Sequence, residues 1–282
     1  MNFKKILKEN IFHIINKYYK YKALYYPNEK IESMLRGTVH AIEKGFVEKD
    51  INYECMINAR VLFYECLKRK LLSADEIYWC ENILFGKVRY EKSRKLIEKS
   101  FSDNYFCDVL KLRRSMRSWQ AGGRIEEREF ERLVDAARWA PSSCNRQPWH
   151  FLLTHDKNKI DYLSQARSQS FIKGAPSCIL VLINLTVYPK EAKYYFAYLD
   201  AGAAIQNMLL MAENIGLGAC WVNFAPSRGI ENYKKRIRQM FAIPAVFDLV
   251  SIIPIGKMKN IQELVKPPGR KEIADIIHYE IF

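Results

Sequence analysis

Hydrophobic periodicity divides the sequence into two parts near residue 105. Up to that point apolar residues recur three or four positions apart and glycine and proline are rare, which is typical of helices. The first such stripe consists of Phe3, Ile6, Leu7, Ile11, Ile14, Ile15 and Tyr18. We therefore expect an all-helical N-terminal region over residues 1–105, and the pattern does not indicate its role.

From about residue 106 onward, helical patterns alternate with short runs rich in β-branched and aromatic residues. An amphipathic helix is indicated by Phe130, Leu133, Val134 and Ala137, and Pro141 fits its end. The expected strands are 149–154, 178–185, 219–224 and 249–256. This alternation predicts an α+β domain over residues 106–282.

A long helix is expected between the second and third strands, over residues 194–216. Gly216 is a natural residue to end it. Its first half is rich in small residues at 197–204, which would allow another helix or a flat ligand to approach closely. We therefore expect this face to form a self-complementary interface between two copies of the chain.

Composition narrows the class of protein. The longest apolar run, near 178–185, is far shorter than the roughly 20 residues that span a bilayer, and the first 22 residues carry too much charge for a signal-peptide core. The seven cysteines have irregular gaps and no CxxC pair, and no two of the five histidines lie three or four apart. A cytoplasmic protein without a structural metal is expected.

The net charge of +14 is spread along the chain rather than gathered in a tail. Residues 1–110 hold 20 basic and 15 acidic residues, and residues 111–282 hold 25 and 16. Without an RNP, zinc-finger or helix-turn-helix motif, a solvated basic surface is the simpler interpretation, and no nucleic-acid partner is expected. The basic first helix could lie on a membrane surface, although such a stripe more often packs on the protein's own core.

The segment 111–119, KLRRSMRSW, sets three arginines around Ser115 just before a helix. Guanidinium groups bind phosphate through paired hydrogen bonds, and a nearby hydroxyl adds another. Alone, this cluster is also typical of a solvated surface. The glycines at 216 and 218 do not form a dinucleotide fingerprint, because they follow a helix and precede a strand.

The order of motifs is more informative than any one of them. R-x-S-x-R is followed by A-P-S-S-x-N-x-Q-P-W, then D-A-G-A-A-I-Q-N, then G-L-G-x-C-W, and finally an arginine in KPPGRKEI. In this order and spacing, residues from about 107 to 282 resemble the nitroreductase family of FMN-dependent oxidoreductases, in its nitroreductase and iodotyrosine-deiodinase-like branches. The resemblance implies a mixed sheet flanked by helices.

The resemblance also implies which residues contact FMN. Arg113, Arg114, Ser115 and Arg117 match the family's flavin clamp, and Arg270 matches a late arginine on the same phosphate. The turn that the family sends from the partner subunit corresponds to Pro141, Ser142 and Ser143, with Asn145 close by. The strand end facing the flavin corresponds to Trp221, Val222 and Asn223, where a backbone N–H near flavin N5 is typical.

The family's activity would make the chain a homodimeric oxidoreductase. NAD(P)H would give a hydride to flavin N5, and a small acceptor such as a nitroaromatic or a quinone would then take the electrons. No catalytic side chain is assigned, because the flavin performs the chemistry. Two alternatives stay open: an FMN-binding protein without nicotinamide turnover, and a basic membrane-docking or partner-docking module with a vestigial flavin site.

Several residues near these motifs have simpler interpretations. Cys144 is more readily a passive small side chain than a nucleophile, because no activating pattern accompanies it. His150 is expected to be a strand residue, and Asn145 could only cap the turn. Where many family members contact the flavin through an asparagine, this chain offers Ser168 or Gln169, and that contact stays open.

Overall fold

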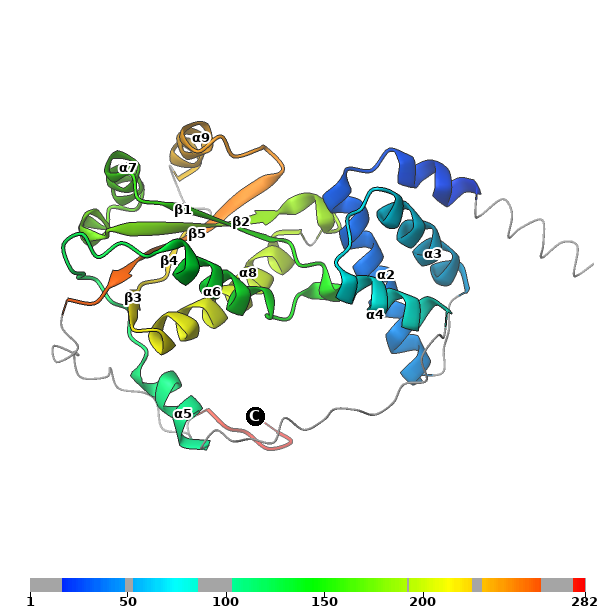
Figure 1. The fold of residues 1–282 in the computed structure, drawn as a ribbon, viewed down its shortest axis with the longest axis horizontal. Helices are drawn as coiled ribbons and strands as arrows, with labels where there is room; N and C mark the ends of the chain where they lie inside the picture. Colours follow the sequence, from blue (N-terminus) through cyan, green and yellow to red (C-terminus); the bar gives the residue numbers. More distant parts are fainter. Residues whose placement is uncertain are drawn as a thin grey trace, which may run out of the picture.

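The N-terminal part of the described chain is a bundle of helices with its own core. The computed structural model describes residues 17–48, 53–85, 103–191, 193–224, 230–259 and 276–281. A helical segment at 17–24 leads into α2 (Asn28–Glu48), α3 (Tyr53–Lys68) and α4 (Ala74–Phe85). Buried Leu35, Leu62, Phe63 and Leu84 pack between these helices, which lie beside the rest of the molecule in Figure 1.

The second part combines helices with a sheet, as the sequence predicts. Its helices are α5 (Asp103–Leu112), α6 (Glu127–Arg138), α7 (Lys157–Arg167), α8 (Lys193–Asn214) and α9 (Ile230–Met240). Short 3₁₀ turns are η1 (Ser143–Asn145), η2 (Ser170–Gly174) and η3 (Leu185–Val187). The strands are β1 (Trp149–Thr154), β2 (Ser177–Asn184), β3 (Leu217–Ala219), β4 (Val222–Asn223) and β5 (Phe247–Lys257).

The sheet has the order β1-β2-β5-β3, and β4 also pairs with β5. All these pairs are antiparallel, and Ser115 adds a parallel bridge to Ala219. The expected strands are confirmed with small shifts, but the run 219–224 divides into β3 and β4. Between them, the backbone N–H of Cys220 still donates to the carbonyl of Pro254 at 3.1 Å, so both pieces stay on β5.

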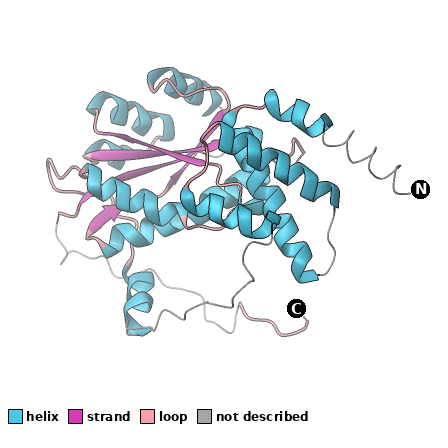
Figure 2. Cartoon of the chain, turned by 45° about the vertical axis from the view of Figure 1, so that its right-hand side comes forward, coloured by secondary structure: helices cyan, strands magenta, loops and turns pink. Residues whose placement is uncertain are grey.

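Helices cover both faces of the sheet. Every residue of β2 is buried, because α6 and α8 pack on one face and α7 and α9 on the other (Figure 1). Figure 2 shows the strands between these layers. On the second face, the ammonium of buried Lys234 contacts both carboxylate oxygens of Asp248 at 2.9 and 3.1 Å, which ties α9 to β5.

The small-residue face of α8 differs from the sequence expectation. Ala197, Ala201 and Ala204 are buried in the chain's own core, where α8 packs closely against α6. These three residues are therefore unavailable to a second copy of the chain. Alanine spacing predicts a close approach, but it does not predict which neighbour approaches.

The helical bundle contacts the α+β domain through α2. A Cβ atom placed on Gly37 would lie 3.5 Å from Cβ of Cys144, so α2 and η1 approach closely there. Glu29 of α2 accepts a hydrogen bond from the side-chain amide of Asn184 at the end of β2. Within the described part of the chain, no helix is long and apolar enough to cross a membrane.

Candidate functional site

The arginine-rich segment 113–117 lies along the edge of the sheet beside β3. The backbone N–H of Met116 donates to the carbonyl of Ala219 at 3.0 Å, which extends the bridge made by Ser115. Trp119 anchors the far end, because its indole N–H donates to the carbonyl of Gly218 at 2.7 Å. The segment is therefore fixed to the edge of the sheet, and the guanidinium of Arg117 donates to the carbonyl of Ser115 at 3.2 Å.

This edge carries positive charge, and the acidic residue that acts on it is Glu213 of α8, whose pKa is raised by burial and lowered by Arg113 and Arg114. Among the described residues, neither Arg113 nor Arg117 forms an ion pair, and Ser115 is exposed. The guanidinium of Arg117 lies 5.6 Å from the ring centroid of Phe171 in η2. Unpaired guanidinium groups of this kind suit a phosphate.

Arg114, the third member of the predicted clamp, is turned toward its own backbone. It donates to the carbonyls of Lys111, in the last turn of α5, and of Arg113. The last carbonyls of a helix, such as that of Lys111, have no hydrogen-bond donor within the helix. In this conformation Arg114 therefore caps α5.

The strand residues predicted to face the flavin lie next to the same edge. Burial raises the pKa of the Cys220 thiol, while Arg117 and the hydroxyl of Ser115 act in the opposite direction, which shows how near they lie. Trp221 and Asn223 are exposed and Val222 is buried, as expected for alternation along a strand. The structure thus brings 113–117 and 221–223 together.

A residue that sequence reasoning missed completes this side. Arg167, at the end of α7, lies 3.5 Å from the side-chain oxygen of Asn223 and 5.4 Å from the ring centroid of Phe224. Its Nε is buried and has no hydrogen-bond partner. It immediately precedes exposed Ser168 and Gln169, where the flavin contact was left open. An unpaired donor here fits an acceptor-rich ligand.

The loop 141–147 has an unusual backbone. Three of its residues have a positive φ, between 50° and 53°: Cys144, Asn145 and Gln147. Residues other than glycine rarely adopt this backbone region. The backbone N–H of Gln147 donates to the hydroxyl of Ser142 at 3.0 Å. Such a strained loop persists only where its surroundings hold it, and it is a frequent feature of ligand-binding sites.

A buried carboxylate on α8 holds this loop. Asp200, only 5% exposed, accepts hydrogen bonds from the backbone N–H of Ser143 at 2.9 Å and from its hydroxyl at 3.0 Å. The hydroxyl of Tyr188 donates to the other oxygen at 2.6 Å. Burial and the Asp200 carboxylate raise the pKa of Tyr188. Sequence reasoning missed both residues, although an aspartate among the small residues of 197–204 was a signal.

The loop and the arginine edge lie on opposite sides of α8. The loop is bound to Asp200, whereas the ring of Trp221 lies 3.5 Å from a Cβ placed on Gly202. Two residues advance about 200° around a helix, whose diameter with side chains is about 10–12 Å. One chain therefore does not bring the two predicted halves of the site together. Arg270 lies outside the described residues.

Two other interpretations can be compared with the geometry. Cys144 is exposed, and its unusual feature is a backbone φ of 52°. His150 is a residue of β1, with its ring edge-on to Phe247 at 4.6 Å. Within the described ranges, no group of three or more His, Cys, Asp or Glu residues is placed to hold a metal ion.

Comparison with known proteins identifies the family of the chain. The model of the nitroreductase family matches residues 110–170 and 162–257. A protein of Methanothermobacter thermautotrophicus, provisionally named an NADH dehydrogenase/NAD(P)H nitroreductase, is 30% identical over 176 residues, which is 61% of this chain and 85% of that protein. Rat iodotyrosine deiodinase 1 is 22% identical over 206 residues, which is 62% of this chain and 68% of the deiodinase.

Solved structures share the fold. The FMN-dependent nitroreductase of Clostridium difficile R20291 superposes with a TM-score of 0.53 at 27% identity, over 62% of this chain and 99% of that one. The sheet, its helices and the basic edge thus define an α+β protein of the nitroreductase type. Since the family model spans more than half of its length, the chain belongs to the nitroreductase family.

Proposed function

We propose that this chain is an FMN-dependent oxidoreductase that passes two electrons from NAD(P)H to a small acceptor such as a nitroaromatic or a quinone. The observation that carries the proposal is the pair of unpaired arginines, Arg113 and Arg117, beside exposed Ser115, Trp221 and Asn223. Relatives named NAD(P)H nitroreductase and an FMN-dependent nitroreductase structure support the same cofactors.

Each part of the basic edge would have its own task toward the cofactor. Arg113, Ser115 and Arg117 would hold the phosphate and ribityl chain, and Arg114 could join them by leaving the end of α5. Asn223 and Arg167 would offer an amide and a guanidinium to the ring. FMN, when bound, supplies the two-electron chemistry. The positive edge would stabilise negative charge on the reduced cofactor.

We further propose that the site is completed in a homodimer. Pro141, Ser142, Ser143 and Asn145 lie across α8 from the basic edge, so a second copy is needed to bring such a loop to the cofactor. An exposed apolar face on α8 supports this arrangement, since Tyr195 and Leu199 lie one turn apart and are 78% and 69% exposed.

The proposed protein has two units and works in the cytoplasm. Residues 1–105 are the proposed helical region and residues 106–282 the proposed FMN-binding domain. Helix α2 packs against the loop 141–147, which is proposed to contact the cofactor. None of the seven cysteines, all of which lie in the described part of the chain, forms a disulfide, which fits a reducing compartment.

Anaerobic titration of the purified protein tests the activity. A yellow protein whose visible flavin absorbance is bleached by NADPH or NADH, and restored by a quinone, would support the proposal. A yellow protein indifferent to both nicotinamides would instead be an FMN-binding protein without turnover. A colourless protein that added FMN cannot reconstitute would overturn the proposal and leave a docking module with a vestigial site.

A further inference from the structure

The apolar stripe at the N-terminus does not pack on the protein's own core where the structure describes it. In the segment 17–24 and the turn after it, Tyr18, Tyr21 and Tyr25 are 52%, 64% and 70% exposed. Ala23 is the one buried residue of the described helical segment, and Tyr19 is held by a hydrogen bond to Glu54 at 2.8 Å. The tyrosines therefore point to solvent while the segment itself is anchored.

These tyrosines continue a regular sequence pattern. Leu7, Ile14 and Tyr21 are spaced seven residues apart, and so are Ile11, Tyr18 and Tyr25. A seven-residue repeat of this kind places its members on one face of a helix. In the sequence, the exposed tyrosines thus belong to a regular apolar pattern rather than standing as isolated apolar residues.

The charged residues of the segment itself are all basic, although Glu54 of α3 accepts the hydrogen bond from Tyr19. Residues 17–26 carry three lysines, Lys17, Lys20 and Lys22, and no acidic residue, and all three lysines are exposed. The ammonium of Lys22 lies 4.6 Å from the ring centroid of Tyr18. Tyrosine has an apolar ring and a polar tip, and together with lysine it is typical of segments that lie in the interface of an anionic membrane.

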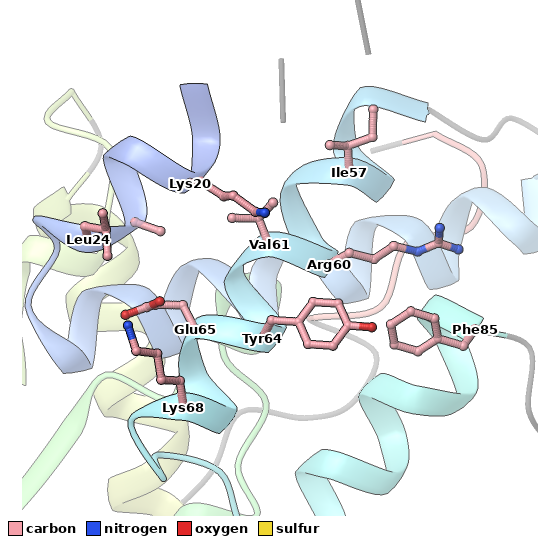
Figure 3. Close-up of a pocket in the computed structure, with 10 residues that line it drawn as sticks. Lys20, Leu24, Ile57, Arg60, Val61, Tyr64, Glu65, Lys68 and Phe85 are labelled. Atoms are coloured by element: carbon pink, nitrogen blue, oxygen red, sulfur yellow. The ribbon is translucent and has the colours of Figure 1, made fainter. Parts of the chain in front are cut away.

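An open groove of about 540 Å³ lies beside this face, between the segment 17–24 and α3 (Figure 3). Its walls include Leu24, Val61 and the ring of Tyr64, which lies 6.0 Å from that of Phe85. Lys20 and Lys68 also line it, and neither forms an ion pair among the described residues. Arg60 and the acidic Glu65 line the groove as well. An apolar groove in which basic side chains outnumber acidic ones is complementary to an acyl chain attached to an anionic headgroup.

We propose that the helical N-terminal unit docks on an anionic phospholipid bilayer through Tyr18, Tyr21, Tyr25, their flanking lysines and this groove. Charge distinguishes this partner from a second copy of the chain. Two such helices side by side would bring lysines against lysines, whereas coiled-coil flanks normally pair opposite signs. Anionic headgroups neutralise the lysines instead.

Flotation of the full-length protein with lipid vesicles tests the proposal. We expect binding to vesicles of phosphatidylcholine with phosphatidylglycerol, loss of binding as salt is raised, and little binding to phosphatidylcholine alone. Replacing Lys20→Gln and Lys22→Gln together should weaken vesicle partitioning by about fivefold per lysine. Tyr21→Ser should weaken it further. All these residues are exposed, so the fold, checked by circular dichroism, should be retained.

Matched changes on α9 serve as controls. Lys235→Gln with Arg236→Gln removes the same charge, and Tyr233→Ser removes an exposed tyrosine, from the other unit. These variants should bind vesicles like the unchanged protein. Equal losses in both sets would overturn the proposal, as would binding that does not depend on the anionic lipid. Self-association that Tyr21→Ser abolishes, without vesicle binding, would also overturn it and assign the face to a second copy.

Discussion

At the scale of single residues, the candidate site gathers several arginines that have no ion-pair partner among the described residues. Among the described residues, four arginines form an ion pair with a carboxylate, as Arg36 does with Glu32 and Glu76. Arg113 and Arg117 form no ion pair within the part of the chain that the structure describes, and Glu213 acts on Arg113 only at longer range. A buried unpaired donor, Arg167 Nε, lies close to the same strand. Ligand binding would compensate these groups.

Replacing Arg117 by alanine should therefore weaken FMN binding. Loss of a hydrogen bond to a charged group costs about 1.5–3 kcal/mol, or roughly a ten- to 150-fold rise in Kd. Arg132→Ala is the matched control, because Arg132 is exposed on α6 and away from the basic edge. Isothermal titration with FMN measures both. Equal affinities in the two variants would remove Arg117 from the site.

The second residue-scale prediction concerns Tyr188. Its hydroxyl donates to Asp200, the carboxylate that also holds Ser143, so Tyr188→Phe should lower the free energy of unfolding by about 1.5–3 kcal/mol. Tyr78→Phe is the control, since Tyr78 is exposed on α4. Urea denaturation followed by circular dichroism compares them. A midpoint for Tyr188→Phe equal to that of the control would contradict this network.

At the scale of elements, α2 and η1 pack directly against each other. Gly37 brings the α2 backbone against Cys144, and the loop behind Cys144 is tied to α8 through Asp200. The strained backbone at Cys144, Asn145 and Gln147 is thus held from two sides, by a helix of the N-terminal bundle and by a helix of the α+β domain. The N-terminal bundle therefore supports the loop that is proposed to reach the cofactor.

A larger side chain at Gly37 should disturb this contact. Gly37→Ala places its Cβ at 3.5 Å, an ordinary contact, and should be neutral or stabilising because alanine favours helix by about 1 kcal/mol. Gly37→Leu should overpack the contact and cost about 1–3 kcal/mol of unfolding free energy, with weaker FMN binding. Gly174→Leu is the control, because nothing lies within 4 Å of a Cβ there. A Gly37→Leu protein as stable as the control would show that α2 does not press on η1.

At the scale of the whole molecule, α8 separates the two halves of the predicted site. The core side of the helix is closed by α6, through Ala197, Ala201 and Ala204. Its outer face carries Tyr195 and Leu199, two neighbouring apolar side chains that are both largely exposed. Single exposed apolar residues are normal on a protein surface, whereas a contiguous apolar patch is typical of an interface. A second copy packed on this face would bury it.

Light scattering should therefore find a dimer at micromolar concentration. Leu199→Glu would place a charge in the proposed interface, so it should shift the protein toward a monomer and weaken FMN binding together. Val246→Glu, at an exposed site before β5, should do neither. A monomeric protein that still binds FMN with unchanged affinity would exclude the shared site.

The periodicity of the sequence determined most of the secondary structure. The helix at 126–140 was predictable because its period of 3.6 residues is a local property of the chain. The strand at 149–154 was predictable because its short run is rich in aromatic and β-branched residues, which is also a local property. The order of the motifs identified the family. The resemblance implied that 113–117 and 221–223 contact the same cofactor, and the structure places them next to each other. Gly216, with φ at +76°, follows α8 as expected.

Tertiary structure decided what each pattern packs against. A stripe of alanines does not specify its neighbour, so α8 buries Ala197, Ala201 and Ala204 in its own chain while Tyr18 and Tyr21 stay exposed. The roles of Asp200 and Arg167 were equally invisible, because each depends on groups 57 and 56 residues away along the chain. Burial, charge pairing and strain are properties of neighbours in space, and spacing along the chain fixes only those neighbours that a single helix or strand supplies.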